Sequence, residues 1–390
     1  MAAETDPAPR RVMIIGAGAT GRGHLGQLAH EAGWELVLVD HNRELIEALR
    51  RVGLYTVRLC RADSARTVTV DGYRAYHTDQ VEAVVREGLT VPLILTSVFS
   101  QNLPHIAPLV ARIIAARAAA GVVTPLNVIC CENMQDSSTV LRDLVLALLE
   151  PHQRAYAAER VGFPNCMVSR VVPLPEGNPL ALVAEDYNEW TVDAGAFVGP
   201  APELPAMELV PDQETRLARK FFMHNGAHAV CGYWGFHRGH TYIHQAIADP
   251  VVSAHVLGAI EELAQVVARR YGLDLGAVRA YGLELGARGA VAEIRDLVSR
   301  VVRDPLRKLS RQERLTAPAV WAVEYGLPCD ELVLAMAAAL HYSAPDDRQS
   351  VEMREQLAAT GADAALPAIL GLPPDHPLVA RVAAAYEAWS

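Results

Sequence analysis

The chain has 390 residues, of which 51% are hydrophobic and 21% are charged, and its formal net charge is −10. This length is typical of two domains, and the composition excludes a disordered or fibrous protein. The excess of acidic residues argues against a surface that binds nucleic acid, although it permits a local basic pocket for one small phosphate.

The cysteines and the start of the chain predict a cytoplasmic location. Six cysteines are scattered along the sequence without a CxxC motif, as is usual in a reducing compartment. The first ten residues, MAAETDPAPR, lack the charged and then apolar layout of an export signal. Apolar runs are interrupted before 18 residues, so we expect no membrane segment.

The first 40 residues predict a strand, a glycine turn, a helix and a second strand. Residues 12–15 form a β-branched and apolar run that ends directly at Gly16. Apolar residues at helical spacing follow, and residues 36–39 form a second apolar strand that ends in Asp40. This order is typical of one βαβ unit.

The same alternation continues through the first half of the chain. In order we expect a helix at 43–50, extra strands within 54–70, a strand at 93–98, a helix at 103–120, a strand at 128–131 and a helix that ends near 150. Alternating strands and helices predict a doubly wound, mostly parallel sheet with ligands at the carboxyl ends of its strands.

A cluster of prolines, GPAPELPAMELVPD, suggests a domain boundary, because proline disfavours regular structure. We therefore predict an α/β N-terminal Rossmann domain over 1–199 and a mainly α-helical C-terminal domain over 200–390. Long helical periodicities prevail in the second part. An apolar helix face can be part of a core or of a subunit interface, and helical periodicity does not distinguish the two. Both a monomer and a small homo-oligomer therefore agree with the sequence.

The glycine turn matches the GxGxxG pattern of dinucleotide-binding sites. Its residues are Gly16, Ala17, Gly18, Ala19, Thr20 and Gly21. The first glycine permits the tight turn, the second lets a pyrophosphate approach, and the third lets helix pack on strand. Asp40, 19 residues after Gly21, would accept hydrogen bonds from ribose hydroxyls and repel a 2′-phosphate. We therefore expect the site to bind NAD rather than NADP, although the positive charge of Arg43 weakens this preference. The alternative to nucleotide binding is a glycine turn with a purely structural role.

A second pattern of chemical groups opens the C-terminal half, in RKFFMHNGAHAVCGYWG. On a regular helix His228 lies roughly 80° and Asn225 roughly 140° round from Lys220, so the three can line one side. A desolvated lysine can take a proton from a hydroxyl while amides or an imidazole stabilise the oxygen. The alternative is a structural helix whose lysine extends to solvent and whose histidine is simply hydrogen-bonded.

Five motifs in a fixed order now resemble one family. GAGATGRGHLGQL, CENM, RKFFxxNxxH, RDPLRKLS and EYGLP are similar to motifs of the long-chain polyol-specific dehydrogenases, most closely the mannitol-1-phosphate 5-dehydrogenase branch. The resemblance extends from Val12 to about Ala385. It implies a Rossmann domain and a helical domain that oxidise a polyol or its phosphate with NAD and without a metal, with the active site between the domains.

The resemblance also implies roles for individual residues. Lys220 would be the general base, Asn225 and Asn133 would donate hydrogen bonds to the reacting oxygen, and His228 would orient it. Ser97 would lie near the cofactor. The substrate-binding candidates are Arg300, Arg303, Arg307, Lys308 and His224. The four cations lie within nine residues and make a plausible anion pocket, although a solvated helix face explains them as well.

Two segments depart from the family pattern where a substrate would bind. Ser97-Val98-Phe99-Ser100 stands in place of a Gly-Pro, and GARGAVAEIRDLVSR lacks the usual Asn-Pro. The reaction type is therefore better defined than the substrate. We expect the interconversion of mannitol 1-phosphate and fructose 6-phosphate, and keep an unphosphorylated polyol, a cyclitol or a sugar acid as alternatives.

Two other functions remain open. Five histidines lie within 21 residues: His224, His228, His237, His240 and His244. Two pairs, 224/228 and 240/244, are spaced by four residues, which can place both rings on one helix face as zinc or iron sites require. No Cys, Asp or Glu at ligand spacing completes a set, so we expect no metal. A nucleotide-sensing module without turnover is the other alternative, although it would not need the base and the amide donors.

Overall fold

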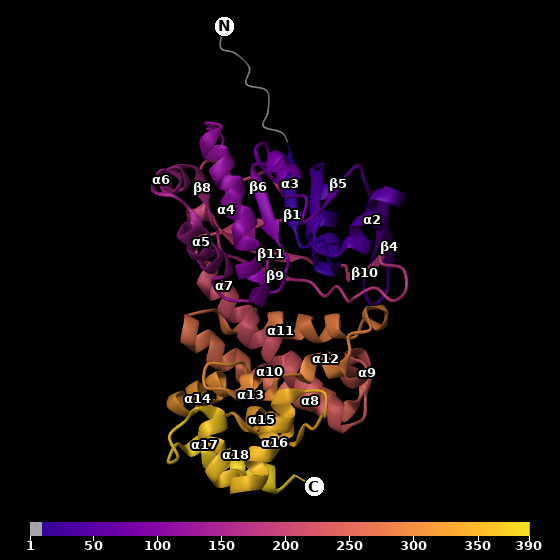
Figure 1. Cartoon of the computed structure of the whole chain (residues 1–390). Coiled ribbons are helices and arrows are strands. Elements are labelled where there is room, and N and C mark those ends of the chain that lie inside the picture. Colours follow the sequence, from indigo (N-terminus) through magenta and orange to yellow (C-terminus); the bar gives the residue numbers. More distant parts are fainter. Residues whose placement is uncertain (1–9, 390) are drawn as a thin grey trace. The chain divides into compact units, whose positions relative to one another are not determined.

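The computed structural model describes residues 10–389, except for the side chain of Leu285. Residues 1–9, in which we expect no export signal, lie outside the described residues. The chain forms two compact units, Met1–Leu217 and Ala218–Ser390 (Figure 1). Each unit is described separately below.

A parallel sheet forms the centre of the first unit, as predicted. Its strand order is β5-β2-β1-β6-β7-β8. The strands are β1 (Arg11–Ile15), β2 (Glu35–Asp40), β5 (Arg74–His77), β6 (Leu93–Thr96), β7 (Leu126–Cys130) and β8 (Val161–Gly162). The order reverses at β1 and β6, and a crevice at the carboxyl ends of such neighbouring strands is the usual ligand site of this architecture.

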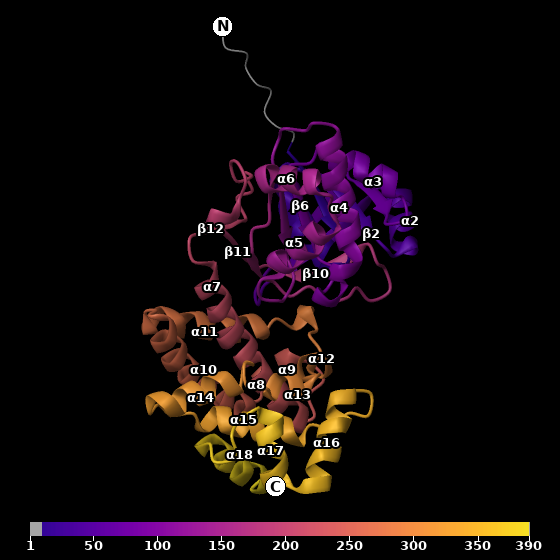
Figure 2. The same cartoon turned by 60° about the vertical axis from the view of Figure 1, so that its left-hand side comes forward.

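Both faces of the sheet are buried, because side chains alternate along each strand. In β1, Val12 and Ile14 belong to one apolar cluster and Met13 and Ile15 to another. Helices α4, α5 and α6 lie over the second face (Figure 2). The helices of the unit are η1 (Gly21–Gly26), α1 (Gln27–Glu31), α2 (Arg43–Val52), α3 (Val81–Gly88), η2 (Ser100–Asn102), α4 (Leu103–Ala119), α5 (Ser137–Leu148), α6 (Pro151–Arg160) and η3 (Ala194–Ala196).

Two small sheets complete the first unit. The extra strands expected within 54–70 are β3 (Leu54–Cys60) and β4 (Ala65–Asp71), which form an antiparallel pair next to β10 (Ala181–Glu185). The other sheet contains β9 (Cys166–Ser169), β11 (Glu189–Asp193) and β12 (Glu208–Val210). Because β12 follows most of the prolines and pairs with β11, the division between the units lies later than the predicted 199/200 boundary.

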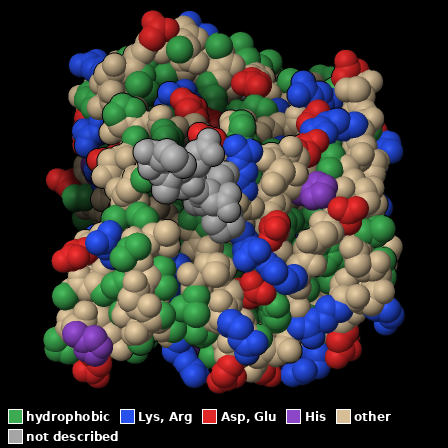
Figure 3. All heavy atoms as spheres, turned by 90° about the horizontal axis from the view of Figure 1, so that it is seen from above, with side chains coloured by type: hydrophobic (Ala, Val, Ile, Leu, Met, Phe, Trp, Pro, Cys, Tyr) green, Lys and Arg blue, Asp and Glu red, His purple; other side chains and the backbone are tan. Residues whose placement is uncertain are grey.

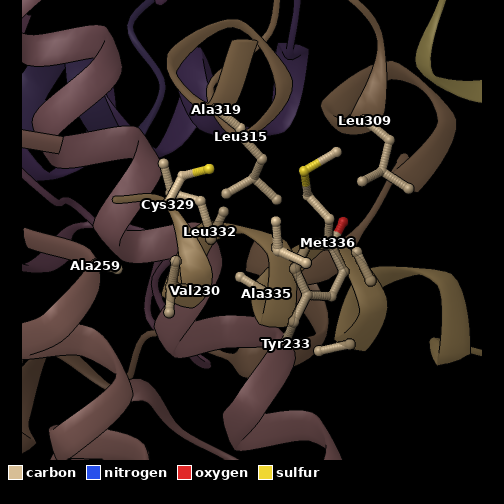
Figure 4. Packing of buried hydrophobic residues seen from close by; sticks show 14 of the residues in the cluster. Val230, Tyr233, Ala259, Leu309, Leu315, Ala319, Cys329, Leu332, Ala335 and Met336 are labelled. Atoms are coloured by element: carbon tan, nitrogen blue, oxygen red, sulfur yellow. The ribbon is translucent and has the colours of Figure 1, made fainter. Parts of the chain in front are cut away.

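The second unit is helical, as predicted. Helix α7 (Gln213–Arg219) crosses the division between the units. The helices that follow are η4 (Lys220–His224), α8 (Asn225–His237), α9 (Ile243–Ala248), α10 (Pro250–Tyr271), α11 (Leu275–Gly289), η5 (Ala292–Ile294), α12 (Val298–Val302), α13 (Pro305–Leu309), α14 (Thr316–Tyr325), α15 (Asp330–His341), α16 (Arg348–Thr360), α17 (Ala362–Leu370) and α18 (Pro377–Glu387). Apolar side chains from α8, α13, α14 and α15 gather in its core (Figure 4).

Helix α10 is the one helix among the described residues that is long and apolar enough to cross a membrane by length and composition. Its most apolar stretch is 56% buried within the protein. Val252, Val256 and Ile260 pack in the core of the helical unit. Because buried core helices also have this length and composition, α10 is weak evidence for a membrane span.

On the face seen in Figure 3, basic and acidic side chains are intermingled. No extended area of one charge covers this face. The mixture follows from a sequence with 35 basic and 45 acidic residues and without a block of like charges.

Candidate active site

The three glycines of the turn after β1 have different surroundings. Gly16 has φ 96°, and a Cβ atom there would lie 2.2 Å from the carbonyl oxygen of Ser97. A Cβ atom at Gly21 would lie 1.9 Å from the carbonyl oxygen of Gly16, whereas one at Gly18 would meet nothing within 4 Å. Gly16 and Gly21 therefore permit close packing, and Gly18 leaves open space beside the backbone, as a bound pyrophosphate requires.

The helix after this turn presents unpaired amide groups. It begins at Ala19, and the first intrahelical bond is donated by the Arg22 amide to the Gly18 carbonyl oxygen, at 3.2 Å. No side-chain capping bond forms at Thr20. The amide groups before Arg22 are thus available to an anion at the helix N-terminus.

A buried arginine donates hydrogen bonds to the backbone of the glycine turn and of a neighbouring segment. Arg22 is 2% exposed; its Nε donates to the Ala17 carbonyl oxygen and its Nη1 to the Pro179 carbonyl oxygen, each at 2.7 Å. Burial lowers the pKa of Arg22, and the nearby Tyr55 and Asp40 oppose this change. The guanidinium fixes the turn and adds positive charge beside the predicted phosphate position.

Asp40 lies at the carboxyl end of β2, as predicted for the ribose-binding acid. Its Oδ1 accepts the Asn42 amide at 2.8 Å and lies 3.3 Å from His41 Nδ1. Arg43, which we expected to temper the cofactor preference, pairs instead with Asp79 at 3.0 Å. The acidic side chain is therefore held in place independently of Arg43.

The carboxyl ends of β6 and β7 bring a buried carboxylate to the sheet edge. The Ser97 amide donates to the Ile15 carbonyl oxygen at 2.8 Å, which places Ser97 beside the glycine turn. Glu132 is 6% exposed and accepts the Val98 amide at 2.8 Å and the Thr96 hydroxyl at 3.1 Å. The predicted hydrogen-bond donor Asn133 follows Glu132 and is exposed at this edge.

A π-helical turn carries the predicted lysine. Residues Lys220–His224 form η4, in which the Asn225 amide donates to the Lys220 carbonyl oxygen, five residues earlier. This spacing places Asn225 about one turn above Lys220, so the separation of roughly 140° expected for a regular helix is wrong here. Lys220 is 8% and Asn225 7% exposed. Such single π turns occur often at functional sites.

His224 lies within a group of cationic and imidazole side chains. Its ring centroid is 5.6 Å from that of His228. Burial, followed by the charges of His228, Arg288, Lys220 and Arg300, holds its pKa well below the ordinary value, so the ring is neutral. Its Nδ1 is buried and has no hydrogen-bond partner among the described residues. A buried polar atom of this kind is costly unless a ligand or water binds it.

Asp296 is a site residue that the sequence analysis missed. Its carboxylate lies 3.1 Å from His228 Nε2 and accepts Arg300 Nε and Nη2, each at 2.7 Å. Burial raises the pKa of Asp296, but the hydrogen bond from His228 and the charges of His228 and Arg300 outweigh it and hold the pKa below its ordinary value. The ionised carboxylate therefore fixes the orientation of the His228 ring.

The predicted cationic pocket is largely occupied by partners within the protein. Arg300 binds Asp296, and Arg307 pairs with Asp304 and Glu313. Lys308 is 5% exposed and donates to the carbonyl oxygens of Val301 and Arg303. Burial and neighbouring arginines lower the pKa of Lys308 to about 7. The segment does not present four free cations, because carboxylates bind Arg300 and Arg307 and backbone carbonyl oxygens bind Lys308.

The remaining histidines of the candidate metal site have other partners. His237 Nε2 is bonded to the Ala338 carbonyl oxygen at 2.8 Å, His240 pairs with Asp249 at 3.0 Å, and His244 stacks on Tyr242. Within residues 10–389, no group of three or more His, Cys, Asp or Glu side chains has a geometry that would hold a metal ion.

Comparison with known families covers nearly the whole chain. The mannitol dehydrogenase Rossmann domain matches residues 10–206, and the mannitol dehydrogenase C-terminal domain matches residues 214–388. The chain belongs to the mannitol dehydrogenase family. This membership confirms the resemblance to the polyol dehydrogenases and the predicted combination of a Rossmann domain with a helical domain.

Two solved structures of other dehydrogenases have the same fold. The ternary complex of Pseudomonas fluorescens mannitol 2-dehydrogenase with NAD and D-mannitol is 18% identical, with a TM-score of 0.76 over 98% of this chain and 92% of that chain. A substrate-free D-sorbitol dehydrogenase is 17% identical, with a TM-score of 0.73 over 95% and 94%. At this identity the likeness describes the fold of the mannitol dehydrogenase family rather than the substrate.

Two signals in the sequence point to the acidic residues that were missed. Asp296 precedes Arg300 by four residues, which is the spacing of a helical ion pair. Glu132 stands directly at the end of a predicted strand, where side chains reach a ligand crevice.

Proposed function

We propose that this protein is an NAD-dependent dehydrogenase that oxidises a secondary hydroxyl of a polyol and reduces the corresponding ketone. The observation that carries the proposal is the group of Lys220, His224 and His228 in the helical domain of a mannitol dehydrogenase family member. The buried His224 Nδ1 of this group has no hydrogen-bond partner among the residues that the structure describes. Polyol hydroxyls both donate and accept hydrogen bonds, so they suit this group.

The residues of the first unit fit NAD. The open space beside Gly18 and the amides at the helix N-terminus would hold the pyrophosphate, and Asp40 would bind the adenosine ribose. When bound, the nicotinamide supplies the hydride acceptor for the oxidation. Asp40 disfavours the 2′-phosphate of NADP through charge repulsion.

The residues of the second unit fit the proton transfer. Lys220 would accept the hydroxyl proton, while Asn225 would donate a hydrogen bond to the oxygen; we assign the same role to Asn133. In the neutral imidazole with a proton on Nε2, His228 donates to Asp296, and its Nδ1 accepts a hydrogen bond from a substrate hydroxyl. No step in this scheme needs a metal ion.

An unphosphorylated polyol is the substrate that we favour. Of the four cations predicted to bind a phosphate, Lys308 is buried against backbone carbonyl oxygens and Arg307 is paired with two carboxylates. The polyol phosphate is the second candidate. It is supported by Arg303, which is exposed and makes no ion pair among the described residues, and by the partly exposed Arg300.

NADH formation tests this proposal. The purified protein is assayed with NAD and, separately, mannitol, sorbitol, inositol and mannitol 1-phosphate, with and without a chelator. We expect turnover of an unphosphorylated polyol that survives chelation. A preference for mannitol 1-phosphate would select the second candidate, and activity lost on chelation would contradict the metal-free mechanism.

Lys220→Ala is the variant that tests the base. Loss of a general base lowers kcat by about 10² to 10⁴, whereas NADH affinity, measured by fluorescence titration, is expected to stay unchanged. Lys308→Ala is the matched control, because that buried lysine is already bound by the backbone carbonyl oxygens of Val301 and Arg303. Unchanged turnover in Lys220→Ala would remove Lys220 from the mechanism.

The state of the cysteines supports a reducing compartment such as the cytoplasm. All six are buried, and none forms a disulfide within the described residues, although the sulfur atoms of Cys131 and Cys166 are 3.8 Å apart. Disulfides are rare in the cytosol, where thiols are kept reduced. Cytoplasmic location therefore remains part of the proposal.

A further inference from the structure

Phe99 combines a costly backbone conformation with an exposed aromatic ring. Its φ is 66° and its ψ 142°, a region that is suited to glycine and strained for any other residue. The other non-glycine residues with positive φ in the described part of the chain are polar: Asp136, Arg295 and Asp304. Phe99 is 71% exposed, so burial of its ring does not offset this cost.

Hydrogen bonds hold the backbone on both sides of Phe99. Glu132 accepts the Val98 amide at 2.8 Å and also accepts the Phe99 amide. Asn102 Nδ2 donates to the Val98 carbonyl oxygen at 2.7 Å, and the Asn102 amide donates to the Phe99 carbonyl oxygen at 2.9 Å. The strained backbone conformation is thus fixed by a buried carboxylate and an asparagine, which also fixes the position from which the ring extends.

The sheet order places Phe99 relative to the cofactor site. Along the carboxyl edge, Asp40 ends β2, the glycine turn follows β1, and Phe99 comes shortly after β6. Ser97 contacts the turn itself, because a Cβ atom at Gly16 would lie 2.2 Å from the Ser97 carbonyl oxygen. A dinucleotide with its adenosine ribose at Asp40 and its pyrophosphate at the turn extends its other half toward β6.

We propose that the ring of Phe99 is a binding surface for the nicotinamide half of the dinucleotide. The inference rests on the proposed function. A planar nicotinamide ring gains by stacking on an aromatic side chain, and a backbone that is already fixed loses little conformational freedom on binding. The favourable contact in the bound state explains why the protein keeps an aromatic residue in a glycine-like conformation.

Binding of two ligands to the full-length protein tests this assignment. NADH carries the nicotinamide, whereas ADP-ribose carries only the adenosine and pyrophosphate half. Phe99→Ala and Phe99→Gly are each titrated with NADH by its fluorescence and with ADP-ribose by calorimetry. We expect NADH affinity to fall about five- to tenfold in both variants, while ADP-ribose affinity stays unchanged.

Two controls separate binding from stability. Leu174→Ala removes another exposed apolar side chain of the first unit, 79% exposed, and should change neither affinity. Phe99→Gly should melt at a higher temperature than Phe99→Ala, because glycine relieves the strain at positive φ. If the affinity losses match in two variants of different stability, they reflect the missing ring rather than a damaged fold.

The outcomes distinguish this inference from the function on which it rests. Unchanged NADH affinity, or equal losses for NADH and ADP-ribose, would overturn the assignment of Phe99 and leave the dehydrogenase proposal standing. If the wild-type protein bound neither ligand, both proposals would fail.

Discussion

Asp296→Asn tests whether a buried carboxylate orients the His228 ring. The substitution keeps the size of the side chain and removes its charge. Asn can still accept one hydrogen bond, but it does not fix the imidazole proton on Nε2, because its amide group also donates. We expect His228 to lose its fixed orientation and the chemical step to slow.

The size of the effect follows from the exposure of the partners. The bond between His228 and Asp296 joins side chains that are 21% and 8% exposed, and a hydrogen bond to a charged group contributes about 1.5–3 kcal/mol. The Arg300 side chain is 59% exposed, so its ion pair adds at most about 1 kcal/mol. We expect the free energy of unfolding to fall by about 2–3 kcal/mol, and kcat by about 10- to 100-fold, since misplacement of a group that positions substrate costs this much.

The pH dependence of the stability loss has a defined sign. In the folded protein the pKa of Asp296 lies below its ordinary value, so the carboxylate stabilises the fold above about pH 4. This contribution is lost as the pH falls through the folded pKa. Urea unfolding should therefore show a constant gap between wild type and Asp296→Asn from about pH 5 to 7, and a smaller gap below about pH 4.

A matched variant provides the control. Asp249 accepts bonds from His240 and Arg238, each at 3.0 Å, and so repeats the same chemistry away from Lys220. Asp249→Asn should leave kcat unchanged. If Asp296→Asn had the same kcat as Asp249→Asn, the reasoning about His228 would be refuted.

Three further predictions concern the cofactor turn, the ribose-binding acid and the buried lysine. Gly18→Ala should fold normally, because its Cβ would meet nothing within 4 Å, but should bind NADH more weakly; Gly21→Ala should lower the melting temperature, because its Cβ would lie 1.9 Å from the Gly16 carbonyl oxygen. Asp40→Ala should weaken NAD and relax discrimination against NADP, and an unaltered ratio of kcat/KM values would mean that the fingerprint is misread. Lys308→Met should change the urea midpoint but not the preference between mannitol and mannitol 1-phosphate, and a changed preference would restore Lys308 as a phosphate ligand.

Local patterns in the sequence predicted the fold class well. Apolar runs ending at Gly16 and Asp40 predicted β1 and β2 because strand periodicity and glycine turns are local properties. The positions of Lys220 and Asn225 in one helical segment were predicted for the same reason. Their mutual orientation was not, because a single π turn has no distinct sequence signal.

Long-range pairing was beyond the reach of the sequence. Residues 200–211 contain a proline cluster that suggests a linker, yet β12 pairs with β11 and belongs to the first unit. The contact between His228 and Asp296 joins residues 68 positions apart, so the spacing of the histidines gave no sign of it.

The sequence alone determined which chemical groups the protein has and the local elements that carry them, since the glycine turn, Asp40, Lys220 and His228 lie in patterns of short range. The tertiary structure decided which of these groups are already occupied. Asp296 binds His228, and Glu132 fixes Phe99 in its strained conformation, through contacts that depend on how separate elements pack.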